Sequence, residues 1–226
     1  MSHPPHHPIT REALASGAIQ QMVQERDGGE HDMLDDAALL ASRRSMVADN
    51  VSEDVWLFGY GSLIWNPVVE VKETRHGRIY GYRRRFCLRT MIGRGTPEAP
   101  GLVLGLDHGG SCTGLGIRID AAIAPQELDL VWKREMLNES YHPAWVNIHT
   151  DSGIIRGLTF VMNRKHRSYA PDLSVDEKVS MIANAHGFIG PCRDYLTETL
   201  ASLDELGIRD RYLEDIARRI DQLPAG

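Results

Sequence analysis

Along residues 51–162 the apolar positions form short runs bounded by glycine and polar turns, the pattern expected for strands. The run Val-Trp-Leu-Phe at residues 55–58 is continuously apolar and ends in glycines, which is typical of a buried strand. Further strands are predicted over residues 68–74, 78–89, 102–106, 115–119, 145–149 and 154–162. Residues 107–111 contain two adjacent glycines and are expected to form the loop of a hairpin.

One helix is predicted between the strands, and three more follow them. Pro125 suits the first position of the inserted helix. Proline fixes a helical φ there, and its missing N–H costs nothing, because the first N–H groups of a helix have no acceptor within the helix. Ser174 and Glu177 have the spacing of a capping box, in which a hydroxyl and a carboxylate cap the helix start reciprocally. The C-terminal helices are expected over residues 174–185, 192–205 and 209–221. This order indicates an α+β fold, a small closed or strongly curved sheet flanked by helices, with a helical C-terminus.

Residues 1–50 differ in composition from the rest of the chain, with eight acidic residues, four basic residues and no aromatic residue. Residues 10–24 and 33–46 are each expected to form a short helix. Such a segment has too few large apolar side chains to build a core of its own. We therefore predict an N-terminal extension over residues 1–50, flexible or loosely helical, and a main domain over residues 51–226 that folds without it.

The composition of the 226-residue chain, 42% hydrophobic and 25% charged, is that of an ordinary globular protein. The formal net charge of −6 argues against nucleic acid or an anionic membrane as a partner. The longest apolar runs are far shorter than a membrane span, and the N-terminus lacks the layout of a signal peptide. Three cysteines without a C-x-x-C spacing indicate a reducing compartment. We expect a cytoplasmic protein.

No metal site is expected. His142, His149, His166 and His186 lack the H-x-x-x-H and H-E-x-x-H spacings that place two imidazoles on one helix face. The histidines near the N-terminus lie in a proline-rich stretch that offers no fixed coordination geometry.

The first candidate for chemistry is the sequence Phe-Gly-Tyr-Gly-Ser-Leu at residues 58–63, directly after the predicted buried strand. Two glycines around a tyrosine allow backbone N–H groups to approach a ligand closely. A dinucleotide fingerprint would need a third glycine at Ile64, and a Walker loop would need a lysine. A plain tight turn that uses glycine for positive φ explains the same residues.

The second candidate is Glu135 on the inserted helix. Leu128, Val131 and Trp132 are spaced i, i+3, i+4 and define an apolar face, on which Glu135 takes the i+7 position. A carboxylate on a core-facing stripe resists ionisation, and its raised pKa suits a general acid–base. Arg134 lies about 100° around the helix, so it need not neutralise Glu135 directly. A glutamate that reaches solvent, or that pairs with a buried arginine, is the alternative.

Seven arginines and no acidic residue lie between residues 74 and 94. In a strand, Arg83, Arg85 and Arg89 share one face, whereas Arg84 lies on the other. One or two of these arginines are candidates to bind a substrate carboxylate in bidentate fashion. A solvated basic face explains them as well, and so does a nucleic-acid surface, although the net charge of −6 argues against the latter.

Three segments, in this order, together resemble the ChaC family of γ-glutamylcyclotransferases. They are residues 55–67 (V-W-L-F-G-Y-G-S-L-I-W-N-P), 132–135 (W-K-R-E) and 190–196 (G-P-C-R-D-Y-L). The sequence F-G-Y-G-S-L-I-W-x-P is specific to that group, and residues 83–86 and Tyr141 also follow its pattern. The resemblance covers about residues 53–222 and leaves the N-terminal extension out.

The resemblance implies a small mixed β-barrel flanked by helices, so that residues 51–226 would be a catalytic domain. It implies a lyase that cleaves the γ-glutamyl bond of glutathione by intramolecular cyclisation to 5-oxoproline and cysteinylglycine, without metal or cofactor. Glu135 would be the general acid–base. The residues that would bind the γ-glutamyl substrate are Phe58, Gly59, Tyr60, Gly61, Ser62, Leu63, Arg85, Tyr141 and Tyr195.

Two alternatives stay open from the sequence. The first is a cyclotransferase for another γ-glutamyl amine or peptide, which shares the chemistry but not the substrate. The second is a regulatory binding module that keeps the barrel without the chemistry, and the carboxylate at position 135 argues against it. The sequence leaves the oligomeric state open, and also which arginine binds a substrate carboxylate.

Overall fold

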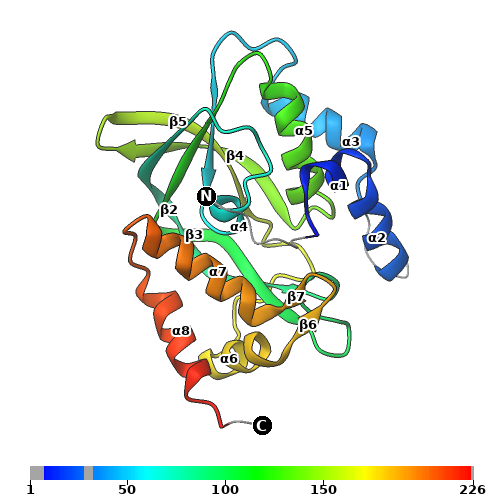
Figure 1. Cartoon of the computed structure of the whole chain (residues 1–226), viewed down its shortest axis with the longest axis vertical. Helices are drawn as coiled ribbons and strands as arrows, with labels where there is room; N and C mark the ends of the chain where they lie inside the picture. The colour runs from blue at the N-terminus through cyan, green and yellow to red at the C-terminus, as the bar shows by residue number, and fades with distance from the viewer. Residues whose placement is uncertain (1–7, 28–32, 225–226) are drawn as a thin grey trace.

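A five-stranded barrel forms the centre of the molecule. The structure, a computed structural model, describes residues 8–27 and 33–224 (Figure 1). The strands are β1 (Val55–Gly59), β2 (Glu73–Thr90), β3 (Gly101–Ile119), β4 (Tyr141–Thr150) and β5 (Gly153–Met162). They form a closed barrel in the order β1-β3-β2-β4-β5.

The barrel is mixed, because its strands do not all run in the same sense. Neighbouring strands are antiparallel except β1 and β5, whose parallel pairing closes the barrel. The predicted α+β fold with a small mixed barrel is confirmed. The strand predicted over residues 68–74 is wrong in its extent, because β2 begins only at Glu73.

β2 and β3 form a long, bent antiparallel ribbon. The hairpin predicted around residues 107–111 is wrong, because these residues continue β3 instead of ending it. The pairing of the two strands shifts in register here, and Gly81, Gly109 and Gly110 have φ values of 86°, 95° and 77°. Glycine adopts positive φ without steric cost, so the two glycines that suggested a loop serve a bulge within the ribbon.

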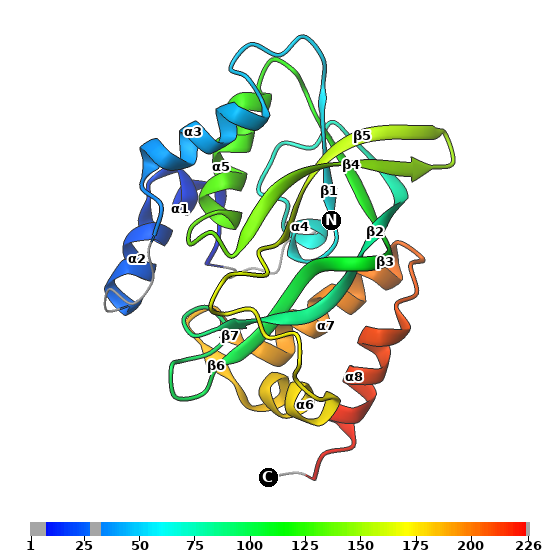
Figure 2. The same ribbon diagram turned by 180° about the vertical axis from the view of Figure 1, so that it is seen from behind.

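Eight helices surround the barrel in the part of the chain that the structure describes. They are α1 (Arg11–Ala15), α2 (Ala18–Asp27), α3 (Asp36–Met46), α4 (Ser62–Trp65), α5 (Ala124–Glu135), α6 (Val175–Asn184), α7 (Cys192–Glu205) and α8 (Arg211–Asp221). Two short strands, β6 (His186–Gly187) and β7 (Gly190–Pro191), pair just before α7. Figures 1 and 2 show α1 to α3 beside α5 on one side of the barrel, and α6 to α8 together on the other. The three predicted C-terminal helices and the Ser174–Glu177 capping box are confirmed.

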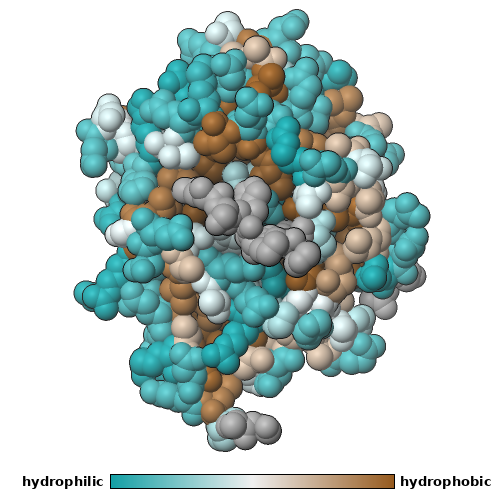
Figure 3. All heavy atoms as spheres, in the orientation of Figure 1, coloured by the Kyte–Doolittle hydropathy of each residue, from teal (hydrophilic) through white to brown (hydrophobic). Residues whose placement is uncertain are grey.

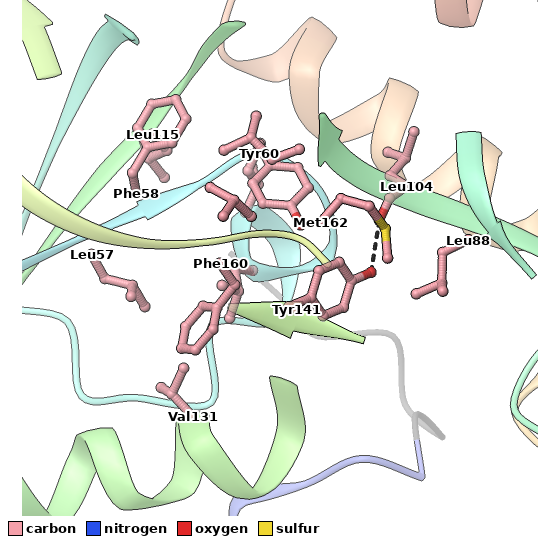
Figure 4. Close-up of a cluster of buried hydrophobic side chains, with 14 of the residues drawn as sticks. Leu57, Phe58, Tyr60, Leu88, Leu104, Leu115, Val131, Tyr141, Phe160 and Met162 are labelled. Carbon is pink, nitrogen blue, oxygen red and sulfur yellow. Dashed lines mark hydrogen bonds between the residues drawn. The ribbon is translucent and has the colours of Figure 1, made fainter. Parts of the chain in front are cut away.

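The apolar face of α5 covers one side of the barrel. Leu128, Val131 and Trp132 are fully buried, as their spacing predicts. The Trp132 indole packs edge-to-face on the ring of Phe160 from β5, with ring centroids 5.1 Å apart. Such aromatic pairs stabilise a core beyond the area that they bury. Figure 4 shows Val131 and Phe160 between α5 and the barrel interior. This packing fixes where the last turn of α5 lies.

The outer surface is mostly polar. On the face drawn in Figure 3, hydrophilic residues dominate, with hydrophobic residues gathered toward the middle of the view. Over residues 8–27 and 33–224, every helix falls short of the length and apolarity that a membrane span needs.

The three cysteines are buried, and none forms a disulfide. The Cys192 thiol, at the start of α7, donates a hydrogen bond to the Leu102 carbonyl oxygen at 3.0 Å and accepts one from the Leu102 N–H at 3.3 Å. Burial raises the pKa of all three thiols, that of Cys87 to about 12. They are packed groups of the core and not nucleophiles.

The N-terminal extension packs on α5. Leu14, Ile19 and Leu39 are only 0%, 4% and 3% exposed, and they belong to the same core as the barrel. The buried Arg43 guanidinium forms an ion pair with Asp129 of α5, with Nε and Oδ1 2.8 Å apart. The described helices of the extension therefore make close core contacts, although the domain boundary at residue 50 stays a prediction.

We expect Leu39→Ala to lower the free energy of unfolding by about 2–4 kcal/mol, because it removes buried methyl groups and leaves a cavity in the core. Leu223, which is 42% exposed, provides the control. Leu223→Ala should change the free energy of unfolding by less than about 0.5 kcal/mol. Chemical denaturation followed by circular dichroism measures both values. Equal stabilities for the two variants would show that α3 is only loosely attached.

Candidate active site

A pocket of about 160 Å³ lies at the C-terminal end of α5. Its walls come from α4, from the facing parts of β2 and β3, and from the beginnings of β4 and α7. The titratable side chains on its lining are Arg94, Arg134, Glu135, Tyr141 and Tyr195. The pocket thus brings together all three segments that carry the sequence motifs. They are residues 55–67, residues 190–196 and the last turn of α5.

Glu135 ends α5 and is paired with its neighbour in sequence. Arg134 Nε lies 3.1 Å from Glu135 Oε1, and the two side chains are 5% and 13% exposed. Burial raises the pKa of the Glu135 carboxyl, and the positive charge of Arg134 opposes part of that rise. Burial also lowers the pKa of the Arg134 guanidinium. The carboxyl therefore resists ionisation more than an exposed glutamate does, which suits a proton-transfer group.

The structure shows the alternative in which Glu135 pairs with a largely buried arginine, and that arginine is Arg134. Both side chains leave the last turn of the helix, where no following turn separates them, and both are largely shielded from water. Pairing offsets the cost of burying each charge alone. The burial of Glu135 agrees with its i+7 spacing from Leu128.

Three tyrosines lie around this pair. Tyr60, Tyr141 and Tyr195 are 5%, 9% and 7% exposed. Burial raises the pKa of each phenol, and the negative charge of Glu135 adds to the rise. The Tyr141 hydroxyl donates to the Leu104 carbonyl oxygen at 2.8 Å (Figure 4). All three phenols therefore stay neutral near pH 7, as groups that can donate hydrogen bonds in a poorly hydrated site.

The turn after β1 brings Ser62 to the pocket lining. α4 begins at Ser62, directly after Gly61, whose φ and ψ are −141° and −128°. A Cβ atom at Gly61 would lie 3.0 Å from the Tyr195 hydroxyl oxygen. Glycine is needed here for this close approach. The other predicted residues of the motif are buried and do not line the pocket: Phe58, Gly59, Tyr60, Gly61 and Leu63.

Arg84 holds the same turn from outside the pocket, a role that sequence reasoning missed. Its Nε donates to the Tyr60 carbonyl oxygen, and its Nη2 donates to the Thr113 carbonyl oxygen at 2.8 Å. Its Nη1 forms an ion pair with Asp210 at 2.6 Å. The available signal was strand alternation, which puts Arg84 on the face opposite Arg85, beside the buried Phe86 and Leu88 positions.

The structure does not bring Arg85 to this pocket. Arg85 Nη2 donates to the Pro171 carbonyl oxygen at 2.7 Å, and its Nη1 lies 3.5 Å from Asp107. Arg94, from the segment after β2, lines the pocket instead, with its Nη2 3.1 Å from Glu198 Oε2. No periodic pattern marks a residue in an irregular segment, so the sequence did not separate Arg94 from its six neighbouring arginines.

Two larger cavities lie elsewhere. One of about 710 Å³ is bounded by α7 and α8, and one of about 520 Å³ is lined by arginines of β2 and by the start of α8. Neither includes Glu135 or Ser62. The smaller pocket is the better candidate, because a concave site with a buried carboxyl of raised pKa is where proton-transfer chemistry is expected. Among the residues that the structure describes, no three His, Cys, Asp or Glu side chains are grouped to hold a metal ion.

Solved structures share this architecture. The chain resembles the crystal structure of a γ-glutamyl cyclotransferase specific to glutathione from yeast, with a TM-score of 0.70 and 20% sequence identity. The match covers 76% of this chain and 97% of the yeast chain. At this identity the likeness concerns the fold, and the class it defines is that of γ-glutamyl cyclotransferase-like barrels flanked by helices.

Sequence comparison defines the family. The model of the ChaC-like protein family matches residues 55–223. The glutathione-specific gamma-glutamylcyclotransferase of Escherichia coli (strain K12) is 39% identical over 172 residues, which cover 76% of this chain and 74% of the relative. The Schizosaccharomyces pombe protein of the same name is 31% identical over 67% of this chain and 84% of the relative. This chain belongs to the ChaC-like protein family, as its motifs indicated.

We expect Gly61→Ala to lower kcat/KM for glutathione, the substrate in the relatives' names, by about 10-fold or more. The added methyl group would push the turn and the Tyr195 hydroxyl apart, and small displacements at a reacting centre cost large factors in rate. Gly116→Ala is the control, because a Cβ there meets its nearest neighbours only at 3.4 Å and outside the pocket. Steady-state kinetics compares the two variants. Equal kcat/KM values would show that the turn does not need its close approach to Tyr195.

Proposed function

We propose that this protein is a γ-glutamylcyclotransferase that cleaves glutathione to 5-oxoproline and cysteinylglycine. The family and the relatives' names support the enzyme class, and with it the lyase expected from the motifs. The observation that carries the proposal is the buried Glu135 carboxyl, with its raised pKa, in a pocket that Ser62 also lines. A cytoplasmic location is part of the proposal, since three free thiols suit a reducing compartment.

The reaction needs one group that moves a proton. The α-amine of the γ-glutamyl residue attacks its own γ-carbonyl carbon, and a C–N bond forms that closes a five-membered ring. The C–N bond to the cysteinyl residue then breaks. Glu135 would take the proton from the attacking amine and return it to the nitrogen of the leaving cysteinylglycine, so that no water or external acid is consumed. Arg134 would keep the carboxyl in position for both transfers.

Rate enhancement would also come from holding the substrate bent. Attack within one molecule requires the amine and the γ-carbonyl to be kept close and aligned, which removes much of the entropic barrier without a covalent enzyme intermediate. Backbone N–H groups of the turn at residues 59–63 would stabilise the negative charge that develops on the carbonyl oxygen. In known enzymes one such donor contributes about 3–4 kcal/mol. Ser62 would then be a binding residue, and not a nucleophile.

The pocket is large enough for only part of the substrate. Its volume of about 160 Å³ is below the roughly 300 Å³ at which pockets for drug-sized ligands begin. The γ-glutamyl group suits this space, with cysteinylglycine extending toward solvent. A γ-glutamyl compound with a different leaving amine would meet the same catalytic group. Kinetics, and not the chemistry of the site, therefore separates glutathione from such a compound as the substrate.

Purified protein is expected to convert reduced glutathione to 5-oxoproline without added metal, at a rate that EDTA does not change. The expectation follows from the use of Glu135 as the only proton-transfer group and from the absence of ligand spacings in the sequence. Mass spectrometry measures 5-oxoproline release from glutathione, γ-glutamyl-alanine and γ-glutamyl-lysine in parallel. Loss of activity on chelation that a divalent ion restores would contradict the metal-free mechanism.

Glu135→Gln is expected to lower kcat by about 10² to 10⁴, the range for loss of a general acid–base, while glutathione still binds. The amide keeps the size and polarity of the carboxyl but cannot accept and return the proton. Glu139→Gln is the matched control, because Glu139 lies exposed in the segment after α5. Calorimetry measures binding, and steady-state kinetics measures turnover. A kcat of Glu135→Gln within about threefold of the wild type would assign the proton to another group.

The raised pKa of Glu135 also predicts the direction of the pH profile. The base must be ionised to accept a proton, so kcat of the wild type should fall as pH decreases through that raised pKa. The fall should therefore occur closer to neutrality than it would for an exposed glutamate.

A further inference from the structure

The residues before α1 form part of the pocket that holds Glu135. Ile9 lies on the pocket lining together with Val103 and Ile189. These three aliphatic residues are half-buried, whereas Tyr141 and Tyr195 on the same lining are buried. Ser62 and Glu135 on the lining are half-buried as well. We name the three aliphatic residues the mouth of the pocket, because they keep contact with solvent and can meet the part of a bound molecule that extends beyond the reacting group.

Two anchors hold this segment in place. Asn66, which follows α4, donates from its side-chain amide to the Ile9 carbonyl oxygen at 3.0 Å. Arg11 donates to the Val68 carbonyl oxygen at 2.8 Å and forms a bidentate pair with Glu127 of α5, at 2.5 and 2.7 Å. Bidentate arginine–carboxylate pairs fix orientation as well as distance.

The Arg11–Glu127 pair joins an exposed side chain to a buried one. Arg11 is 42% exposed, whereas the Glu127 side chain is 7% exposed and its Oε2 also accepts the N–H of Glu70 at 2.5 Å. Burial alone would raise the pKa of Glu127, but these hydrogen bonds outweigh burial and lower it. Glu127 therefore stays ionised, and the segment before α1 stays clamped to the helix that ends in Glu135.

Asn66 also connects this segment to the catalytic pair. Its backbone carbonyl oxygen accepts a hydrogen bond from Arg134 Nη1. One residue thus bonds Ile9 through its side chain and Arg134 through its main chain. The match to the family begins at residue 55, so Ile9 comes from a part of the chain that the family match does not include.

We propose that Ile9, held by Arg11 and Asn66, is a specificity-determining residue that contacts the cysteinyl side chain of glutathione at the mouth of the pocket. The proposal rests on the proposed function. If the γ-glutamyl group reacts at Glu135 and fills the small interior, the next residue of the substrate reaches the mouth. The side chain of cysteine is short and uncharged, and it suits an aliphatic wall made by Ile9, Val103 and Ile189.

Glutathione and γ-glutamyl-glycyl-glycine test this contact, because they differ only in the CH₂–SH group of the middle residue. The quantity measured is the ratio of the two kcat/KM values, from 5-oxoproline release. Ile9→Ala is expected to lower this preference for glutathione by about 5- to 10-fold, the scale on which small apolar contacts discriminate substrates. The kcat/KM for γ-glutamyl-glycyl-glycine should change by less than about twofold. A merely structural role would lower both values alike.

Glu127→Gln provides a second variant, outside the pocket. It removes the charge that holds Arg11 and should lower the preference for glutathione in the same direction. Because both changes act on one contact, the double variant Ile9→Ala with Glu127→Gln should lose no more preference than the stronger single variant. Asp129→Asn is the matched control, since Asp129 pairs Arg43 to the same helix without lining the pocket. Its preference for glutathione should equal that of the wild type.

The outcomes separate the two proposals. If the wild type releases 5-oxoproline but Ile9→Ala and Glu127→Gln keep its preference, the role of Ile9 is wrong and the proposed function stands. If the wild type releases none from either tripeptide, the proposed function fails, and the role of Ile9 fails with it. A change in Asp129→Asn as large as that in Glu127→Gln would also overturn the role of Ile9, since general loosening of the extension would then explain both.

Discussion

An arginine and a glutamate that follow one another in sequence are buried together at the end of α5, and the pocket is organised around them. Burying either charge alone would cost several kcal/mol, so each is stable there only because the other is present. Arg134 also bonds the carbonyl oxygen of Asn66, which ties the helix to the end of α4. Arg134 therefore has two roles. Its pairing with Glu135 stabilises both charges in the core, and its hydrogen bond to Asn66 sets the distance between the Glu135 carboxyl and the turn after β1.

The sequence predicted the position of Glu135 but not the direction of Arg134. Helical periodicity is a property of the backbone, so the spacing from Leu128 determines which face Glu135 occupies. The long side chain of Arg134 can turn either way, and its surroundings in the folded protein decide. Strand alternation separated Arg84 from Arg85 in the same way, but it does not say which face meets a substrate. The assignment of Arg85 to the substrate came from the family pattern, and its position in the fold does not support it.

Composition alone does not show how the N-terminal extension is attached. It has no aromatic residue, yet Leu14, Ile19 and Leu39 are almost completely buried. Small aliphatic side chains suffice for burial when another helix supplies the opposite half of the interface, and α5 does so here. The glycines at 109 and 110 gave a similar ambiguity, because a bulge within a long ribbon needs the same backbone freedom as a loop. In both cases the deciding partner is distant in sequence, where a local pattern carries no information.

The three cysteines are buried and the pKa of each thiol is raised, so they are poorly suited to exchange with thiols and disulfides in solution. Exchange between a thiol and a disulfide proceeds through the thiolate, and a pKa of about 12 leaves almost none of Cys87 in that form at neutral pH. The Cys192 thiol is in addition hydrogen-bonded to the main chain of β3. Oxidised glutathione therefore meets no reactive sulfur on the folded protein, and mixed disulfides form only as slowly as the core opens. If glutathione is the substrate as proposed, a shift of the cellular pool toward the disulfide would reach this protein through the supply of substrate, and not through its own covalent state.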